Sequence, residues 1–183
     1  MKWFTLLVGL SITALTVHPS QAQASPRGIE GQKAPEWAVS EWVQLQGKKA
    51  PTLKNSQGKV LYLFFFQSWC PGCNSHGFPT MKAVQKNFAS NPNVKFVTIQ
   101  TVFEGFWVNS NEKAKSTAES FGLRIPVGHD AGPTDEGSIT MRRYRSGGTP
   151  WTVIIDRNGV VRFNGFRMSP SKATGLIREL LKK

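Results

Sequence analysis

The feature that most constrains this chain is an uninterrupted apolar run, KVLYLFFF at residues 59–66, which ends shortly before both cysteines of the protein. A run of this length without polar alternation is typical of a central strand that is covered on both faces. The cysteines, Cys70 and Cys73, follow in the sequence WCPGC, at the head of a segment (75–89) with helical apolar spacing. The sequence therefore predicts a buried strand, a short turn that carries two cysteines, and a helix.

The rest of the chain continues this alternation of strands and helices. The pattern predicts a second buried strand (94–102) and a further helix (111–122). It also predicts a hairpin around Asn158-Gly159 (151–166) and an amphipathic C-terminal helix (169–183) with Ser169 as its N-cap. Residues 25–58 are rich in Gly, Pro, Lys and Gln and predict a leading extension with one or two short strands. We therefore expect an α/β fold with a mixed central sheet and helices on both faces.

The N-terminal segment is typical of a secretory signal peptide. Lys2 precedes an apolar region of 15 residues (3–17), and Ala22-Gln23-Ala24 has the small-x-small pattern of a cleavage site. This apolar region is shorter than the roughly 20 residues that span a bilayer. We therefore expect residues 1–24 to be removed without leaving a stable membrane anchor. A single domain (25–183) would then act in the periplasm or another extracytoplasmic compartment.

The chain is strongly basic, with a formal net charge of +12. Such a charge favours anionic surroundings, which include acidic proteins, lipid headgroups and nucleic acid. Export argues against a nucleic-acid partner. Because the basic residues are scattered along the chain, they also fit an ordinary solvated surface.

The two cysteines allow three interpretations: a structural disulfide, part of a metal site, or a redox pair. A disulfide across two intervening residues constrains little of the unfolded chain. The mature chain has two histidines, His76 and His129, so a four-ligand zinc site is hard to build, although two thiolates suit copper(I). A cysteine at a helix start has a stabilised thiolate, and a second cysteine one turn later can resolve a mixed disulfide. We therefore expect no metal and no cofactor beyond a redox-active disulfide.

The surroundings of the cysteines resemble the thioredoxin fold. Three features carry the resemblance: a strand followed by WCPGC and a helix, the GGTP sequence at residues 147–150 before TVIIDRNGVV, and the terminal helix. The segments GQKAPEWAVSEW and GKVLYLFFFQSWC are more specifically similar to exported TlpA-like and ResA-like thiol–disulfide oxidoreductases. The resemblance runs from about Gly31 onward. It implies a thioredoxin-like three-layer sandwich.

The resemblance also implies a role for each residue of the motif. Cys70 would be the nucleophile, and Cys73 would be the resolving thiol. Pro150 would form a cis peptide bond facing the cysteines, while Thr149 would present backbone groups to an extended partner segment. Trp69 would pack beside the disulfide.

The implied activity is thiol–disulfide exchange with cysteine-containing protein substrates, supplied with electrons by an upstream thiol–disulfide donor. The Thr before Pro150 and the N-terminal extension favour a reductase. An oxidase or isomerase, and a copper-binding or non-catalytic thioredoxin-like module, remain the alternatives. Peroxiredoxins place a hydroxyl residue three positions before the reactive cysteine, where this chain has Gln67, so we do not expect peroxidase activity.

The chain departs from the thioredoxin pattern beside the redox pair. Phe64 stands where many thioredoxins carry a buried acid that moves the resolving thiol's proton. Glu104 and Asp130 are candidates to replace it, and His76 is a candidate proton shuttle, although all three also fit exposed positions. Pro79 follows Cys73 by six residues, whereas the family spacing is five.

Three further segments invite functional interpretations. The residue added before Pro79, for which Gly77 is the candidate, is expected to bulge the start of the helix. The aromatic residues Phe103, Phe106 and Trp107 would form either a substrate-facing lip or part of the core. A last group, Arg142, Arg143 and Arg145, precedes the GGTP sequence and favours either an acidic client or a solvated face.

Overall fold

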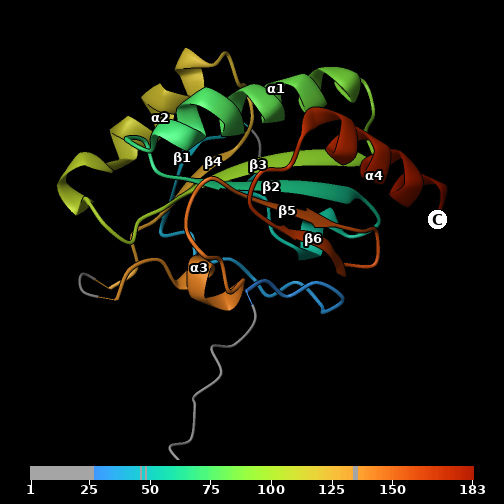
Figure 1. Ribbon diagram of the computed structural model, residues 1–183, viewed down its shortest axis with the longest axis horizontal. Coiled ribbons are helices and arrows are strands. Elements are labelled where there is room, and N and C mark those ends of the chain that lie inside the picture. The colour runs from blue at the N-terminus through green and yellow to red at the C-terminus, as the bar shows by residue number, and fades with distance from the viewer. Residues whose placement is uncertain (1–26, 46, 48, 134–135) are drawn as a thin grey trace, which may run out of the picture.

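Strand β2 (Val60–Phe66) lies inside a six-stranded mixed sheet with the strand order β1-β4-β3-β2-β5-β6 (Figure 1). This computed structural model describes residues 27–45, 47, 49–133 and 136–183, so the predicted signal peptide (1–24) lies outside the described residues. Strand β3 runs parallel to β2 on one side, and β5 runs antiparallel to it on the other. The apolar run is therefore a central strand, as the sequence predicts.

Strand β2 contributes side chains to a hydrophobic core on each face of the sheet, because successive side chains of a strand point to opposite faces. Tyr62, Phe64 and Phe66 belong to the core cluster that includes the buried residues of the long helices. Leu61, Leu63 and Phe65 belong to the cluster on the other face. All seven residues of the strand are buried, which explains why the apolar run shows no polar alternation.

The remaining elements follow the predicted order, with two additions. The strands are β1 (Glu41–Gln44), β3 (Val94–Thr101), β4 (Val127–Asp130), β5 (Trp151–Ile155) and β6 (Val161–Gly165). The helices are α1 (Phe78–Asn87), α2 (Asn111–Ser120), α3 (Ile139–Arg143) and α4 (Pro170–Lys182), with short 3₁₀ turns at Lys54–Ser56 and Phe106–Val108. Ser169 caps α4 by accepting a hydrogen bond from the Lys172 N–H group, as predicted.

Helices cover both faces of the sheet, which confirms the predicted three-layer architecture. Helices α1, α2 and α4 lie on one face, whereas α3 and the N-terminal segment lie on the other (Figure 1). Ile29 and Trp37 from the N-terminal segment join the second core, where the Tyr144 hydroxyl donates a hydrogen bond of 2.7 Å to Pro35 O. Among the described residues, no helix is long and apolar enough to cross a bilayer.

Strand β4 and helix α3 are elements that the sequence did not predict. Asp130 ends β4, and its Oδ2 atom accepts hydrogen bonds from Ser138 Oγ (2.8 Å) and Thr140 N (2.7 Å) at the start of α3. The interpretation of Asp130 as a solvated loop residue is therefore wrong. Its carboxyl group is buried and holds the beginning of a helix in place.

A π-helical turn, η2 (Cys73–Gly77), begins at the second cysteine and leads directly into α1. Such turns arise when one residue is added to an α-helix. The turn confirms the predicted bulge and accounts for the wide spacing between Cys73 and Pro79. Gly77 has helical backbone angles (φ −61°, ψ −57°), but a Cβ atom there would lie 2.3 Å from Phe64 Cζ. The close approach of the Phe64 ring therefore requires glycine for steric reasons.

We expect Gly77→Ala to lower the free energy of unfolding by about 1–3 kcal/mol, because the added methyl group overpacks the core against Phe64. Urea unfolding followed by circular dichroism measures the change. Gly175→Ala is the matched control, since nothing lies within 4 Å of a Cβ atom at that position in α4. The control is expected to be neutral or stabilising. Adding Phe64→Leu should recover part of the loss caused by Gly77→Ala, and an unchanged loss would contradict the assignment of the clash.

Candidate active site

Cys70 stands at the point where the chain leaves the sheet and enters the helical segment. Gln67 and Ser68 are buried at the end of β2, and helical backbone begins directly after Cys70. Cys70 Sγ accepts a hydrogen bond of 3.2 Å from Cys73 N, and Cys70 O accepts bonds from Cys73 N (3.1 Å) and Asn74 N (3.2 Å). The sulfur atom therefore occupies the N-cap acceptor position, where backbone N–H groups lack partners within the helix.

The two thiols have opposite acid–base character. A hydrogen bond from the Cys73 side chain, assisted by the Thr149 side chain and the N–H groups of Cys73 and Gly72, overcomes the effect of burial and lowers the pKa of Cys70 to about 6. Burial raises the pKa of Cys73 far above its ordinary value, and its hydrogen bond to Cys70 raises the pKa further. Both cysteines are free thiols. At neutral pH the pair therefore holds one thiolate and one thiol.

The loop before β5 closes over the same sulfur atom. The Thr149–Pro150 peptide bond is cis, and Thr149 O lies 3.6 Å from Cys70 Sγ. A Cβ atom on Gly72 would lie 3.1 Å from Pro150 Cδ, so the Pro150 ring packs against the CPGC turn. Gly148 has a φ of 139°, a backbone conformation that side chains other than glycine rarely adopt. The structure thus brings together Cys70, Cys73, Thr149 and Pro150.

Asn109 is a site residue that sequence reasoning missed. Its Oδ1 atom accepts a hydrogen bond from Ser68 N (3.0 Å), and its Nδ2 atom donates to Gln67 Oε1 (3.1 Å) and to the carbonyls of Glu104 and Gly105. Asn109 therefore ties the loop after β3 to the residues just before Trp69 and Cys70. The sequence indicates Asn109 only by its position directly before a helix N-cap. Its partners Gln67 and Ser68 lie 42 and 41 residues earlier in the chain, so local pattern could not predict these bonds.

Aromatic side chains stand exposed near the cysteines. Trp69 is 45% exposed, Phe103 and Phe106 are similarly open, and Trp107 is 86% exposed. A Cβ atom on Gly105 would lie 3.3 Å from Trp69 Nε1, so the loop that carries these residues passes beside Trp69. The interpretation of Phe103, Phe106 and Trp107 as core residues is therefore excluded, and the lip interpretation stays open.

Within the described part of the chain, no hydrogen bond joins the candidate relay residues Glu104, Asp130 and His76 to either thiol. His76 is exposed and lines a groove with Thr149 and Pro150, and the Glu104 side chain is exposed without a hydrogen bond among the described residues. His129 is buried in β4, and its Nδ1 atom lies 3.0 Å from Gln100 Nε2. Burial lowers the pKa of His129, which favours the neutral ring.

The missing acid at Phe64 leaves the resolving thiol in apolar surroundings. The ring of Phe64 packs edge-on against Phe78, with ring centroids 5.1 Å apart, and stacks on Phe66. The groups that shift the pKa of Cys73 are its own burial, Cys70, the Gln67 N–H group and Thr149, and none of these is a carboxylate. Among the residues that the structure describes, no carboxylate is therefore placed to accept the proton of Cys73.

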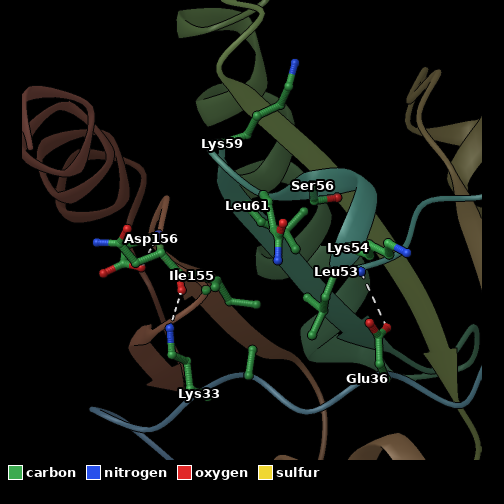
Figure 2. Close-up of a pocket in the computed structure, with 13 residues that line it drawn as sticks. Lys33, Glu36, Leu53, Lys54, Ser56, Lys59, Leu61, Ile155 and Asp156 are labelled. Carbon is green, nitrogen blue, oxygen red and sulfur yellow. Dashed lines mark hydrogen bonds between the residues drawn. The ribbon is translucent and has the colours of Figure 1, made fainter.

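A separate pocket lies at the opposite end of β2 from the cysteines (Figure 2). Its lining includes Leu61 at the beginning of the strand, together with Lys33, Lys54 and Lys59. Lys33 Nζ donates to Asn158 O and Lys59 Nζ to Pro92 O, so these ammonium groups do not converge on one point. Across the described ranges, no three His, Cys, Asp or Glu side chains gather in an arrangement that could hold a metal ion.

Comparison with known proteins identifies the family of this chain. Residues 30–164 match the AhpC/TSA family. The chain is 26% identical to the thioredoxin-like protein YneN of Bacillus subtilis, over 88% of this chain and 87% of that protein. It is 27% identical to the thiol–disulfide oxidoreductase ResA of Geobacillus kaustophilus, over 88% of this chain and 83% of that protein.

Solved structures agree with this assignment. A thiol–disulfide isomerase from Corynebacterium glutamicum superposes with a TM-score of 0.71 at 30% identity, over 82% of this chain and 97% of that one. A thioredoxin-like superfamily protein superposes with a TM-score of 0.73 at 31% identity, with the same coverage. This chain belongs to the AhpC/TSA family of thioredoxin-like proteins and is a thiol–disulfide oxidoreductase of the thioredoxin superfamily.

Proposed function

We propose that this protein is exported and reduces disulfide bonds in cysteine-containing partner proteins through Cys70 and Cys73. The observation that carries the proposal is the hydrogen bond from Cys73 N to the Cys70 sulfur, at a position where the sulfur is ionised and Cys73 is protonated. The thiolate is the nucleophile in disulfide exchange, and the neighbouring thiol stays protonated until it resolves the mixed disulfide. An upstream thiol–disulfide donor then restores the reduced pair.

The reaction proceeds in two exchanges. The Cys70 thiolate attacks one sulfur atom of the partner disulfide, which forms a mixed disulfide and releases the other partner sulfur as a thiolate. Cys73 then loses its proton and attacks Cys70 Sγ, so the Cys70–Cys73 disulfide forms and the second partner sulfur leaves. Two electrons pass from the dithiol to the partner, and the partner thiolates take up protons. Pro150 and Thr149 border Cys70 and flank the approaching segment.

The acidity of Cys70 supports the reductase direction. A pKa of about 6 is closer to the value of about 7 for thioredoxin than to the value of about 3.5 for the oxidant DsbA. A Cys70 thiol with a still lower pKa would stabilise the reduced form further and make the pair more oxidising. The relatives named ResA carry the name thiol–disulfide oxidoreductase, which is consistent with either direction.

The alternatives rest on narrower grounds. Because the lowered pKa of Cys70 does stabilise the reduced form to some extent, an oxidase or isomerase is the second candidate, and one similar solved structure is named an isomerase. Copper binding would use the same two thiols. Peroxidase activity is disfavoured because Gln67, whose side chain is bonded to Asn109, takes the place of a hydroxyl residue.

Export is supported by the signal-peptide pattern of residues 1–24, with its positive start, short apolar region and small-x-small site. The extracytoplasmic environment is one in which partner disulfides form and persist. A reductase in this environment acts on disulfide bonds that would otherwise persist.

We expect Cys70→Ser to abolish exchange with a protein disulfide, because the nucleophile is lost. Cys73→Ser should accumulate mixed disulfides, because the captured partner cannot be displaced. Non-reducing gel electrophoresis and mass spectrometry distinguish the two outcomes. Exchange at the wild-type rate by Cys70→Ser would overturn the assigned roles, and a peroxide assay on the same proteins tests the disfavoured alternative.

The rate at which iodoacetamide alkylates Cys70 should rise with pH through about 6 and level off near neutrality, because the thiolate fraction rises through the pKa. Below that pH the rate falls as the thiolate is protonated. Cys73→Ala should move the midpoint upward toward about 8.5, because the largest contribution to the shift is lost. Cys73→Ser, which keeps a hydroxyl donor, should move it less. Equal midpoints in all three proteins would contradict the role of the Cys73 side chain.

Titration of the pair against glutathione should give a midpoint potential more negative than about −200 mV, on the thioredoxin side of the known range. Quantifying the alkylated dithiol by mass spectrometry at each ratio gives the potential. A value near about −120 mV would instead identify an oxidase.

A further inference from the structure

A groove of about 650 Å³ opens directly beside the redox pair. Its lining includes Gly72, Ser75 and His76 from the cysteine turn. Thr149 and Pro150 next to Cys70 line it as well, together with Phe166 and Arg167, which follow β6. An extended segment whose cysteine reaches Cys70 therefore has room to continue past an aromatic ring and a guanidinium group.

Packing contacts fix the position of the Phe166 ring in this groove. The ring of Phe166 packs edge-on against Trp151, with centroids 4.6 Å apart, and a Cβ atom on Gly148 would lie 3.5 Å from Phe166 Cζ. The neighbouring Asn164 side chain donates to Tyr144 O (3.1 Å), which secures the end of β6 to the end of α3. Arg167 follows this anchored stretch with a φ of 53°, so its backbone direction is set by a tight turn.

Two further arginines surround the loop that leads into Pro150. The Arg27 side chain lies over Gly147, because a Cβ atom there would be 2.7 Å from Arg27 Cδ. Gly28 N donates to Arg145 O (3.0 Å), which brings the N-terminal segment alongside Arg145. Arg27, Arg145 and Arg167 thus come from three separate parts of the chain and gather around residues 145–150.

These three arginines are not neutralised within the described part of the chain. The ion pairs found there join Arg142 to Glu136 and Arg162 to Asp156. No carboxylate lines the groove. The Glu30 carboxylate is engaged elsewhere, because its Oε1 atom accepts a hydrogen bond from Asn164 N (2.9 Å). The surface beside Cys70 therefore carries excess positive charge.

We infer that this groove selects partner segments that carry acidic residues close to the reactive cysteine. The inference rests on the proposed function and names the class of substrate for the same site. Carboxylates beside the partner cysteine meet Arg167 in the groove and the field of Arg27 and Arg145 at its edge, while an apolar neighbour packs on Phe166. Complementary charge raises the rate of productive encounter and disfavours segments rich in lysine.

The test uses three peptides that are identical except for the residues flanking one cysteine, which are Glu, Gln or Lys. The cysteine is joined to thionitrobenzoate as a mixed disulfide, so attack by Cys70 on the peptide sulfur releases a coloured thiolate. Cys73 then displaces the peptide thiol and closes the Cys70–Cys73 disulfide. At low ionic strength the Glu peptide should react about tenfold faster than the Lys peptide. In about 1 M salt, where the screening length is about 3 Å, this preference should largely disappear.

Arg167→Gln should reduce the ratio of Glu-peptide to Lys-peptide rates by about threefold, because one charge is removed at contact distance. Arg27→Gln is a second variant that reports independently if Arg167→Gln does not fold. Arg178→Gln is the matched control, since it removes the same charge from the exposed face of α4 away from the groove. Equal rates for the three peptides, or an equal loss in Arg178→Gln, would overturn the inference. Failure of all three peptides to react with the wild-type protein would instead overturn the proposed function.

Discussion

The hydrogen bond from the Cys73 N–H group to the Cys70 sulfur connects the fold of this protein to its chemistry. It forms because β2 ends at Phe66 and helical backbone begins directly after Cys70. The buried strand fixes the position of the turn, and the helix start places the Cys73 N–H group within hydrogen-bond distance of both Cys70 O and the Cys70 sulfur. One sulfur atom is thereby stabilised as an anion, while the same packing keeps the Cys73 thiol neutral and inaccessible.

The absence of an acid at Phe64 changes how the second thiol becomes reactive. Two of the influences that raise the pKa of Cys73 are its hydrogen bond to Cys70 and the negative charge of that sulfur. Both are removed once Cys70 is bonded to a partner, whereas the effect of burial remains. In the proposed reaction, the capture of a partner would therefore lower the pKa of the Cys73 thiol before the second exchange. The aromatic packing of Phe64 against Phe78 takes the space that a carboxyl group would need.

The sequence predicted the elements whose pattern is local. The apolar run at β2, the hairpin at β5 and β6, and the Ser169 cap of α4 follow from residue type and spacing, as does the CPGC turn. Strand β4 escaped prediction because Gly128, His129 and Asp130 look like loop residues. They are buried through long-range contacts: Gly128 admits the Val39 side chain, His129 meets Gln100, and Asp130 holds α3. The bonds of Asn109 and the approach of Arg27 and Arg167 to the loop at residues 145–150 were missed for the same reason.

The N-terminal segment enters the second core almost as soon as the described chain begins. Gly28 N is bonded to Arg145 O, and Ile29 is buried. If the leader is removed after Ala24, four residues (25–28) separate the new amino end from a packed side chain. Because a protease needs an extended, accessible substrate, such cleavage would have to precede the docking of Gly28 and Ile29. Under the proposed export, the order of maturation would be translocation, cleavage and then completion of the fold.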